Sequence, residues 1–283
     1  MQSVAHILHT LRCVSCSGNL TKATDGYSCS RCNRAYRATD SCLFVIEPSS
    51  SLHSERPDGI VFRLKLWVKK YPKLFTVLNH TLGTYVGKSA KQCISSLPKG
   101  SVIVNIGSGA EIIREDIINV DIDPYPGVRI TADIHTLPFK DSSVDAVISE
   151  SVLEHVKDPI RAVAEMRRIL KPGGLLYIVV PFIIGYHSSP GDYYRWTTSG
   201  MRELLKEFKE QELGIAVGPT NALTYILREW LATLFSFNSN SLYQILVVFF
   251  MVLFAPVNLL DHFLKHYASS PVIAHLYYFI GTK

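Results

Sequence analysis

Two glycines and an aspartate stand where they could hold a nucleoside cofactor. The β-branched run 102–106 ends directly before Gly107 and Gly109, and such a run predicts a buried parallel strand whose carboxyl end meets a ligand. Glycine at this point lets the ligand lie close to the backbone. A second apolar run, 117–120, ends on Asp121, where a doubly wound sheet places the carboxylate that binds a ribose diol.

The details distinguish two classes of cofactor. A dinucleotide fingerprint needs a third glycine at position 112 and an acid about 20 residues after the first glycine, but the chain has Ile112 and Asp121 comes too early. The motifs that follow, in their order and spacing, resemble those of class I S-adenosylmethionine-dependent methyltransferases: TADIHTLPF (131–139), VDAVIS (144–149), LEHV (153–156) and LKPGGLLYIVVP (170–181). The resemblance extends from about Ser101 to Val217.

The resemblance implies a set of residues that contact the cofactor: Asn105, Gly107, Gly109, Asp121, Ile122, Asp133, Ile134, Ser149 and Glu150. Gly107 and Gly109 would face the methionine part, and Asp121 would bind the ribose hydroxyls. Asp133 would accept a hydrogen bond from the adenine amino group, and the amide of Ile134 would serve the ring. The family also implies a mixed sheet that ends in an antiparallel pair, here 212–218 and 276–281.

Two features depart from the family pattern. The residue near the end of the first strand is usually acidic in the family and is Asn105 here. The connection from Gly109 to Ile117 is too short for the usual first helix. Ser149 and Glu150, just past a later strand, are expected to border the reaction pocket.

Four cysteines form two CxxC pairs with the spacing of a metal site. Four thiolates on two such turns can close a tetrahedral zinc site, and the segment resembles the zinc ribbon also found in the activator subunit of certain tRNA and protein methyltransferases. A rubredoxin-like iron site and disulfides are the alternatives. We expect a structural zinc ion, because a closed four-thiolate site leaves no open position for chemistry. The ligands would be Cys13, Cys16, Cys29 and Cys32.

The loop after Val180 carries the residues expected on the acceptor side. It leaves the carboxyl end of a strand, the edge where open α/β sheets bind ligands. His187 could take a proton from a hydroxyl acceptor, oriented by Asp192, while Arg195 could bind a phosphate or carboxylate. In the alternative interpretation Asp192 and Arg195 pair only to shape the loop, and His187 is exposed.

The segment before this loop predicts a helix and a strand. Asp158-Pro159 begins the helix, whose apolar positions recur at helical spacing: Ile160, Val163, Met166 and Ile169. Lys171-Pro-Gly-Gly ends it before a strand at 175–180. Glu154 and His155 precede the helix, and for His155 a scaffold role is favoured over that of a base. A further helix is expected at 197–208.

Composition bounds the function class. The 283 residues carry a net charge of +5, which permits an anionic partner but does not favour nucleic acid. The hydrophobic share of 47% and the positive mean hydropathy of +0.16 are high for a soluble enzyme. No signal peptide is expected, because residues 1–12 lack both a basic start and a long apolar run.

The surplus apolar residues lie in the last third of the chain. No charged residue occurs between Glu229 and Asp261, a length that could supply one membrane-spanning helix of about 20 residues. A single span would, however, leave the last strand on the far side of the membrane, and Pro256 divides the stretch. We therefore expect a helical hairpin that dips into one leaflet, or else a helical cap buried over the active site or in a dimer interface.

The expected fold is α/β, a doubly wound Rossmann-like methyltransferase sheet with two additions. The ranges are a zinc ribbon at 1–48, a linker with basic amphipathic helices at 49–99, the S-adenosylmethionine-binding domain at 100–221, an apolar helical insertion at 222–270 and the last strand of the sheet at 271–283. The basic segment 63–73, with Trp67 among its lysines, could lie on an anionic membrane or pack on the sheet.

The sequence predicts a methyltransferase on the cytoplasmic face of a membrane, peripheral or monotopic, with a lipid-like or lipid-linked acceptor. Two alternatives stay open. One is a soluble natural-product methyltransferase in which the insertion forms a cap. In that case the insertion could also join two copies of the chain into a homodimer. The other is a non-catalytic subunit of a partner methyltransferase.

Overall fold

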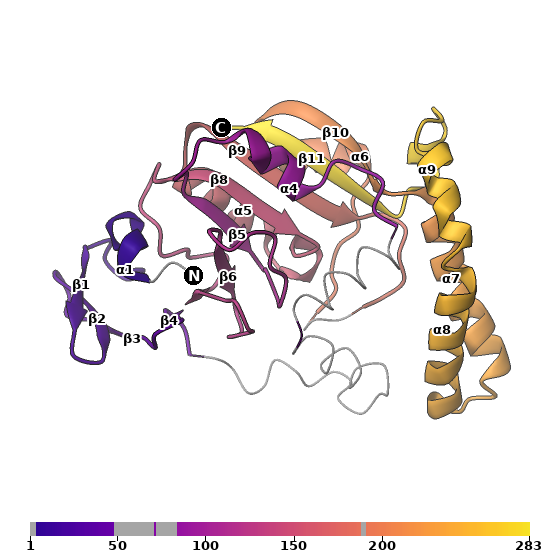
Figure 1. Cartoon of the computed structure of the whole chain (residues 1–283), viewed down its shortest axis with the longest axis horizontal. Helices are drawn as coiled ribbons and strands as arrows, with labels where there is room; N and C mark the ends of the chain where they lie inside the picture. The colour runs from indigo at the N-terminus through magenta and orange to yellow at the C-terminus, as the bar shows by residue number, and fades with distance from the viewer. Residues whose placement is uncertain (1–3, 48–70, 72–83, 188–190) are drawn as a thin grey trace.

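An eight-stranded sheet forms the centre of the molecule (Figure 1). The computed structural model describes residues 4–47, 71, 84–187 and 191–283. The strand order is β10-β11-β9-β8-β5-β6-β7-β4. The strands are β4 (Leu43–Phe44), β5 (Ile103–Ile106), β6 (Ile118–Asp121), β7 (Ile130–Thr131), β8 (Val144–Glu150), β9 (Leu170–Pro181), β10 (Lys209–Val217) and β11 (Leu276–Thr282).

The strands from β4 to β9 run parallel to one another, so their carboxyl ends share one edge of the sheet. β11 runs antiparallel to both β9 and β10, which makes β10 parallel to β9. The predicted α/β fold with a closing antiparallel pair is therefore confirmed. It follows that the chain leaves β10 and enters β11 at the same edge at which β5, β6 and β8 end.

Short helices cover the two faces of the sheet. α5 (Pro159–Ile169) and α6 (Thr198–Leu204) pack on one face, and α4 (Ala90–Cys93) packs on the other. Asp158 and Thr197 cap α5 and α6 as their sequence positions indicate.

Three sequence expectations about these elements need correction. α6 ends at Leu204, four residues before Phe208. β9 already begins at Leu170 and includes the Lys171–Gly174 segment, because Leu170 pairs with Val144. Ile160 was expected on the buried face of α5 but is 73% exposed, because the buried stripe is centred on Ala162, Val163 and Met166 and Ile160 lies outside it.

The connection between β5 and β6 contains no helix, as its length predicts. Residues 107–117 form turns and bends only. Within the described residues the family's usual first helix is therefore absent, and the glycine loop leads almost directly into the next strand.

The N-terminal residues pack onto the same core as the sheet. A three-stranded antiparallel sheet, β1 (Leu20–Ala23), β2 (Gly26–Cys29) and β3 (Ala35–Arg37), follows α1 (Val4–Ile7) and a 3-10 turn η1 (Leu8–Thr10). Leu11 and Tyr36 belong to one buried cluster with Leu137 and Phe139. β4 then adds to the edge of the central sheet beside β7.

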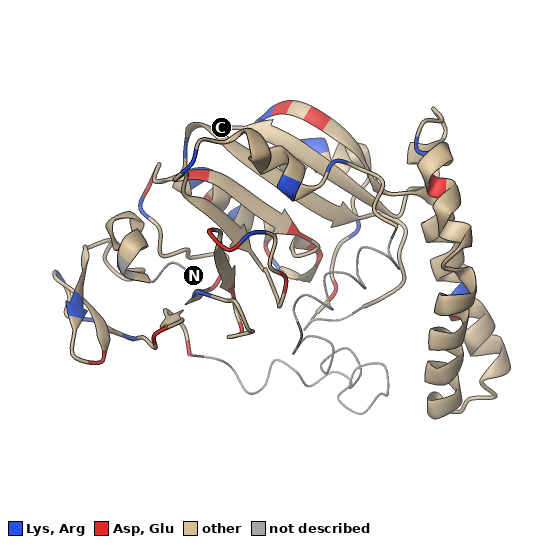
Figure 2. Ribbon diagram, in the orientation of Figure 1, with Lys and Arg blue, Asp and Glu red and all other residues tan. Residues whose placement is uncertain are grey.

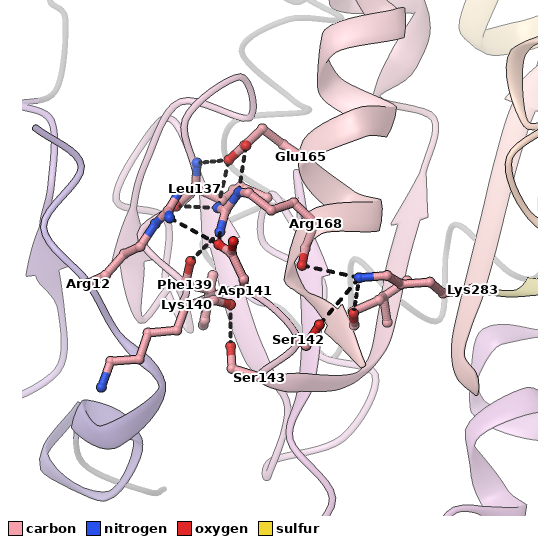
Figure 3. Close-up of polar contacts among 11 residues, drawn as sticks. Arg12, Leu137, Phe139, Lys140, Asp141, Ser142, Ser143, Glu165, Arg168 and Lys283 are labelled. Carbon is pink, nitrogen blue, oxygen red and sulfur yellow. Dashed lines mark hydrogen bonds and ion pairs between the residues drawn. The ribbon is translucent and has the colours of Figure 1, made fainter. Parts of the chain in front are cut away.

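A polar network reinforces this junction (Figure 3). The Arg168 guanidinium donates to Glu165, to Asp141 and to two backbone carbonyls. Arg12, from the N-terminal segment, donates to the same Asp141 carboxylate at 3.0 Å. Lys283 near the end of β11 donates to the carbonyl oxygen of Leu170 at 2.7 Å. Segments from both ends of the chain thus meet around α5.

Two helices pair with each other in the insertion between β10 and β11. They are α7 (Pro219–Phe235) and α8 (Asn240–Phe254), followed by η4 (Val257–Leu260), α9 (Asp261–Leu264) and η5 (Ser270–Ile273). In Figure 1 the pair stands to one side of the sheet. The buried Asp261 carboxylate caps α7 by accepting from the backbone N–H groups of Thr220 and Asn221 at 2.7 and 3.0 Å.

Among the described residues, no single helix has the length and hydrophobicity to cross a bilayer. α8 and the 257–264 segment, which meet at a bend of 44°, are together long and apolar enough to cross a bilayer. The bend follows Pro256, as expected. The predicted linker at 48–59 and almost all of the basic segment at 63–73 lie outside the described residues.

Candidate active site

The glycine loop and Asp121 are joined by a direct hydrogen bond. Asp121 ends β6, and its Oδ2 accepts from the backbone N–H of Gly109 at 2.7 Å. Both glycines have positive φ, +68° at Gly107 and +54° at Gly109, which glycine adopts without strain. A Cβ at Gly107 would collide with Val152, whereas a Cβ at Gly109 would meet open space. The loop is therefore packed on its Gly107 side and open at Gly109, as a surface that receives a ligand requires.

Asn105 faces the neighbouring strand. Its amide nitrogen donates to Oδ1 of Asn119 at 3.3 Å, and Asn119 in turn donates to the carbonyl oxygens of Glu111 and Gly127. Both asparagines are buried. The pair links β5 to β6 and to the carbonyl oxygens of Glu111 and Gly127, which gives a structural reason for an amide where the family usually has an acid.

The residues assigned to the adenine ring lie at the ends of the next strands. Asp133 follows β7, and its half-exposed carboxylate accepts from the backbone and ring nitrogens of His135 through Oδ1. Ile134 is partly buried, and Ile122, just after Asp121, is 38% exposed. An apolar side chain left open beside two carboxylates is a suitable wall for a purine ring.

Ser149 and Glu150 end β8 on opposite faces of the sheet. Burial and the negative charge of Glu111 raise the pKa of Glu150 to about 8. The Ser149 hydroxyl is fully buried and makes no hydrogen bond within the described part of the chain. Ser151, the residue after Glu150, has a φ of +53°, a strained conformation that often accompanies functional turns.

The polar loop after β9 is organised by Arg195. Its guanidinium holds the Asp192 carboxylate with two nitrogens and donates to the carbonyl oxygens of Ile184, Gly185 and Tyr194. These five bonds use all five N–H donors of an arginine. Of the two interpretations of Arg195, the geometry therefore favours loop shaping, because no donor remains for a phosphate or carboxylate. Asp192 also accepts from the backbone N–H of His187 at 2.8 Å.

The His187 ring lies beside His155, for which a scaffold role was favoured, and beside Glu154, to which the sequence assigned no role. Glu154 and His155, in the 3-10 turn η3 (Leu153–His155) after β8, approach it within 4.8 Å. No local sequence pattern identifies this group, because its members follow two different strands. The available signal was that histidines occur after both β8 and β9, whose carboxyl ends lie side by side.

The four cysteines of the N-terminal region converge. Their Sγ atoms lie within 4.8 Å of one another, and none of the six cysteines forms a disulfide. The Cys13–Cys32 and Cys16–Cys29 sulfur pairs are 3.6 and 3.4 Å apart. Sulfurs at about 2.3 Å from a tetrahedral ion lie about 3.8 Å from one another, so the four thiols fit one metal ion.

With this geometry in view, comparison with known proteins identifies the domain. Residues 106–178 match the family model described as a methyltransferase domain. The chain carries a class I, S-adenosylmethionine-dependent methyltransferase domain. The matched region runs from the end of β5 into β9 and contains most of the cofactor residues assigned above.

Curated relatives match about a third of the chain. Over 98 residues the chain is 37% identical to a probable S-adenosylmethionine-dependent methyltransferase of Mycobacterium tuberculosis, covering 30% of this chain and 35% of that protein. Over 99 residues it is 40% identical to an uncharacterized 37.1 kDa transposon protein of Streptomyces fradiae, covering 35% and 27%. The chain thus spans roughly a third of the length of these relatives.

Among solved structures, one similar chain is phosphoethanolamine N-methyltransferase 2 of Haemonchus contortus. That structure holds phosphomonomethylethanolamine and S-adenosylhomocysteine. The TM-score is 0.50 at 18% identity, covering 85% of this chain and 62% of that one. This likeness supports the methyltransferase fold and nothing finer.

Proposed function

We propose that the protein transfers a methyl group from S-adenosylmethionine to a lipid-like or lipid-linked acceptor at a membrane surface. The observation that carries the proposal is topological. The apolar insertion leaves β10 and re-enters β11 at the edge where the glycine loop and Asp121 lie. An acceptor held by this insertion would lie near the methyl donor.

The cofactor would bind along the ends of β5, β6 and β7. Asp121 would hold the ribose hydroxyls, Asp133 the adenine amino group, and the open side of Gly109 the methionine part. When bound, the cofactor supplies an electrophilic methyl group on a sulfonium. The protein then needs chiefly to hold donor and acceptor in line, which supplies much of the rate.

The insertion offers an apolar surface that the described part of the chain leaves exposed. No residue of α8 is buried. Only four charged residues occur between positions 219 and 270, and Figure 2 shows the helix pair almost free of charge colours. Large apolar side chains that are about half exposed or more lie along the two helices and beyond: Leu223, Trp230, Leu234, Phe237, Ile245, Phe249, Val252, Leu253, Leu259 and Phe263.

The base of the insertion contacts the polar loop. The Tyr225 ring of α7 lies over Gly185, where an added Cβ would come within 3.0 Å, and 5.4 Å from the His275 ring. An acceptor could therefore place its polar group near His187 and its apolar tail along the helices. A lipid leaflet suits a pair of short helices that lies in the interface. We accordingly propose a monotopic or peripheral location on the cytoplasmic face.

We further propose that Cys13, Cys16, Cys29 and Cys32 bind a structural zinc ion. The Tyr36 hydroxyl lies 3.0 Å from the Cys13 sulfur, and the backbone N–H of Arg31 donates to the Cys29 sulfur at 3.4 Å. Hydrogen bonds of this kind stabilise zinc-bound thiolates.

The non-catalytic alternative draws on two observations, the amide at Asn105 and the absence of the first helix. Cofactor binding discriminates the two functions. We expect S-adenosylmethionine to raise the thermal midpoint, and Asp121→Ala to weaken its binding by about tenfold to a hundredfold, the loss of hydrogen bonds to a charged group. Asp116→Ala, on an exposed turn, is the matched control. An unaltered midpoint with excess cofactor would reject the enzyme.

The acceptor class requires a separate experiment. The protein is incubated with methyl-labelled S-adenosylmethionine and a total extract of its host, and the label is followed into organic and aqueous phases. Label in the organic phase, lost in Asp121→Ala, supports a lipid-class acceptor. Label confined to the aqueous phase would contradict it and favour the soluble methyltransferase whose insertion acts as a cap or dimer interface.

A further inference from the structure

Three side chains able to bind a metal meet at the carboxyl edge of the sheet, apart from the cysteine cluster. Oε1 of Glu154 lies 3.9 Å from Nε2 of His155 and 3.8 Å from Nε2 of His187. The two imidazole rings meet edge to face with centroids 5.0 Å apart. Glu154 and His155 follow β8, and His187 follows the neighbouring parallel strand β9.

Hydrogen bonds fix which nitrogen of each histidine carries the proton. Nδ1 of His155 lies 2.5 Å from the carbonyl oxygen of Gly191, and Nδ1 of His187 lies 3.2 Å from that of Gly185. A carbonyl oxygen only accepts, so each Nδ1 must donate. In the neutral rings Nε2 then carries no proton and keeps a free lone pair, and both Nε2 atoms lie within 3.9 Å of Oε1 of Glu154.

The Glu154 carboxylate is buried without a hydrogen-bond partner, and the Arg195 guanidinium acts on it only through its charge. The Glu154 side chain is fully buried, and neither carboxylate oxygen has a hydrogen-bond partner within the described residues. Burying an unpaired carboxylate is costly, and separations of 3.8 and 3.9 Å are too long for hydrogen bonds to the imidazoles. Three electron-pair donors whose atoms lie within 4.8 Å of one another form a group that a metal ion can compensate.

We propose that Glu154, His155 and His187 bind a divalent transition-metal ion through one carboxylate oxygen and the two Nε2 atoms. Ligand atoms at about 2.0–2.2 Å from a tetrahedral ion lie about 3.4 Å apart, so the two separations between Glu154 and the histidines need to shorten by roughly half an ångström. Two imidazoles and one carboxylate suit zinc, iron(II) or cobalt(II) better than magnesium, which prefers an all-oxygen set.

The metal site gives Asp192 and Arg195, which lie beside His187 in the polar loop, a role in positioning a ligand. Asp192 lies 3.6 Å from Nδ1 of His187 and is held by Arg195. The Gly185 carbonyl oxygen, which accepts from Nδ1, is the partner outside the ligand set that orients the imidazole. Asp192 fixes the backbone of His187 by accepting from its N–H at 2.8 Å. Asp192 and Arg195 would then be positioning residues, and His187 would be a ligand instead of the general base, because a nitrogen bound to a metal cannot take a proton.

Three protein ligands leave coordination positions that an acceptor oxygen can occupy. The site would then select an acceptor that presents a hydroxyl, phosphate or carboxylate oxygen. This use rests on the proposed methyl transfer, whereas metal binding itself does not.

The test is a titration with cobalt(II) of the full-length protein that carries one zinc ion per chain, bound in the cysteine cluster, followed by equilibrium dialysis and absorption. Zinc in the cysteine cluster keeps that site from contributing thiolate-to-cobalt bands. We expect the wild type to bind one cobalt ion per chain without such bands. Glu154→Gln and His187→Ala should each weaken binding more than about a hundredfold, and Asp192→Asn about tenfold to a hundredfold.

Controls separate this result from misfolding and from the proposed function. His262→Ala, at an exposed histidine on α9, should bind cobalt like the wild type. Circular dichroism and S-adenosylmethionine binding report whether each variant folds, and Glu154→Gln keeps the shape of the buried side chain. Equal cobalt affinity in the wild type and both ligand variants, or no binding by the wild type at millimolar cobalt, would overturn the proposal. Neither outcome depends on methyl transfer.

Discussion

The N-terminal residues 4–47 and the insertion 219–270 both lie outside the cofactor-binding sheet, yet they bury opposite kinds of side chain. The N-terminal region places Leu11 and Tyr36 in the main core and adds a strand to the sheet. The insertion keeps its apolar side chains exposed and buries polar groups at its base, where Asp261 caps α7 and Thr224 donates to Asn258 at 2.7 Å.

This difference teaches how each region relates to the sheet. A region that shares the core cannot loosen without exposing apolar surface of the sheet. A region fastened by a few hydrogen bonds can keep its outer surface for another purpose. Four changes test the contrast, in order of decreasing expected effect.

Removing the metal from the cysteine cluster should have the largest effect. Cys29→Ser, or chelation of the protein, should unfold residues 4–47 and lower the thermal midpoint of the whole domain, because structural metal binding is folding free energy and the core is shared. Circular dichroism and metal analysis measure both. Cys93→Ser, at a buried cysteine outside the cluster, is the control. Finding no bound metal in the wild-type protein would reject the prediction.

Arg168→Met should destabilise the junction by about 3–5 kcal/mol, since it leaves the partly buried Glu165 without its ion-pair partner and the carbonyl oxygens of Leu137 and Phe139 without their donor. Denaturant titration measures the free energy of unfolding. The matched variant Arg202→Met removes an exposed pair with Glu210 and should cost less than about 1 kcal/mol. Equal losses in the two variants would contradict the proposed role of the network.

Asp261→Ala should release the base of the insertion at a cost of about 2–3 kcal/mol, because the two buried N–H groups of Thr220 and Asn221 lose their acceptor. Hydrogen exchange should accelerate in the first turn of α7 while β5 and β8 stay protected. Asp261→Asn retains an acceptor oxygen and should lose less. Faster exchange throughout the sheet would show that the insertion is not attached independently.

Polar substitution of the outer face should have the smallest effect on stability. Phe249→Ser with Val252→Ser changes two side chains that are 56% and 60% exposed, so the free energy of unfolding in water should shift by less than about 0.5 kcal/mol. Flotation with anionic vesicles should nevertheless show weaker association. Unchanged flotation, or a large loss of stability, would count against a lipid-facing surface.

Local sequence patterns were sufficient for much of the fold. The β-branched run before Gly107, the carboxylate at Asp121 and the capped helix at Pro159 depend on residues close in the chain, and the structure contains all three. The shortness of the 109–117 connection correctly predicted that it contains no helix. Ile160 was misplaced because helical spacing alone does not say which side of a short helix meets the sheet.

What the sequence determined, then, is the set of parts: strands, glycine loop, cysteine pairs and an apolar insertion. Only the tertiary structure decided three further points. All five N–H donors of Arg195 bond within its own loop, and Asn105 donates to Asn119. Glu154 and His155 lie against His187. The physical reason is that these contacts join different strands and loops. Which side chains meet there depends on strand order and register, and no local pattern encodes them.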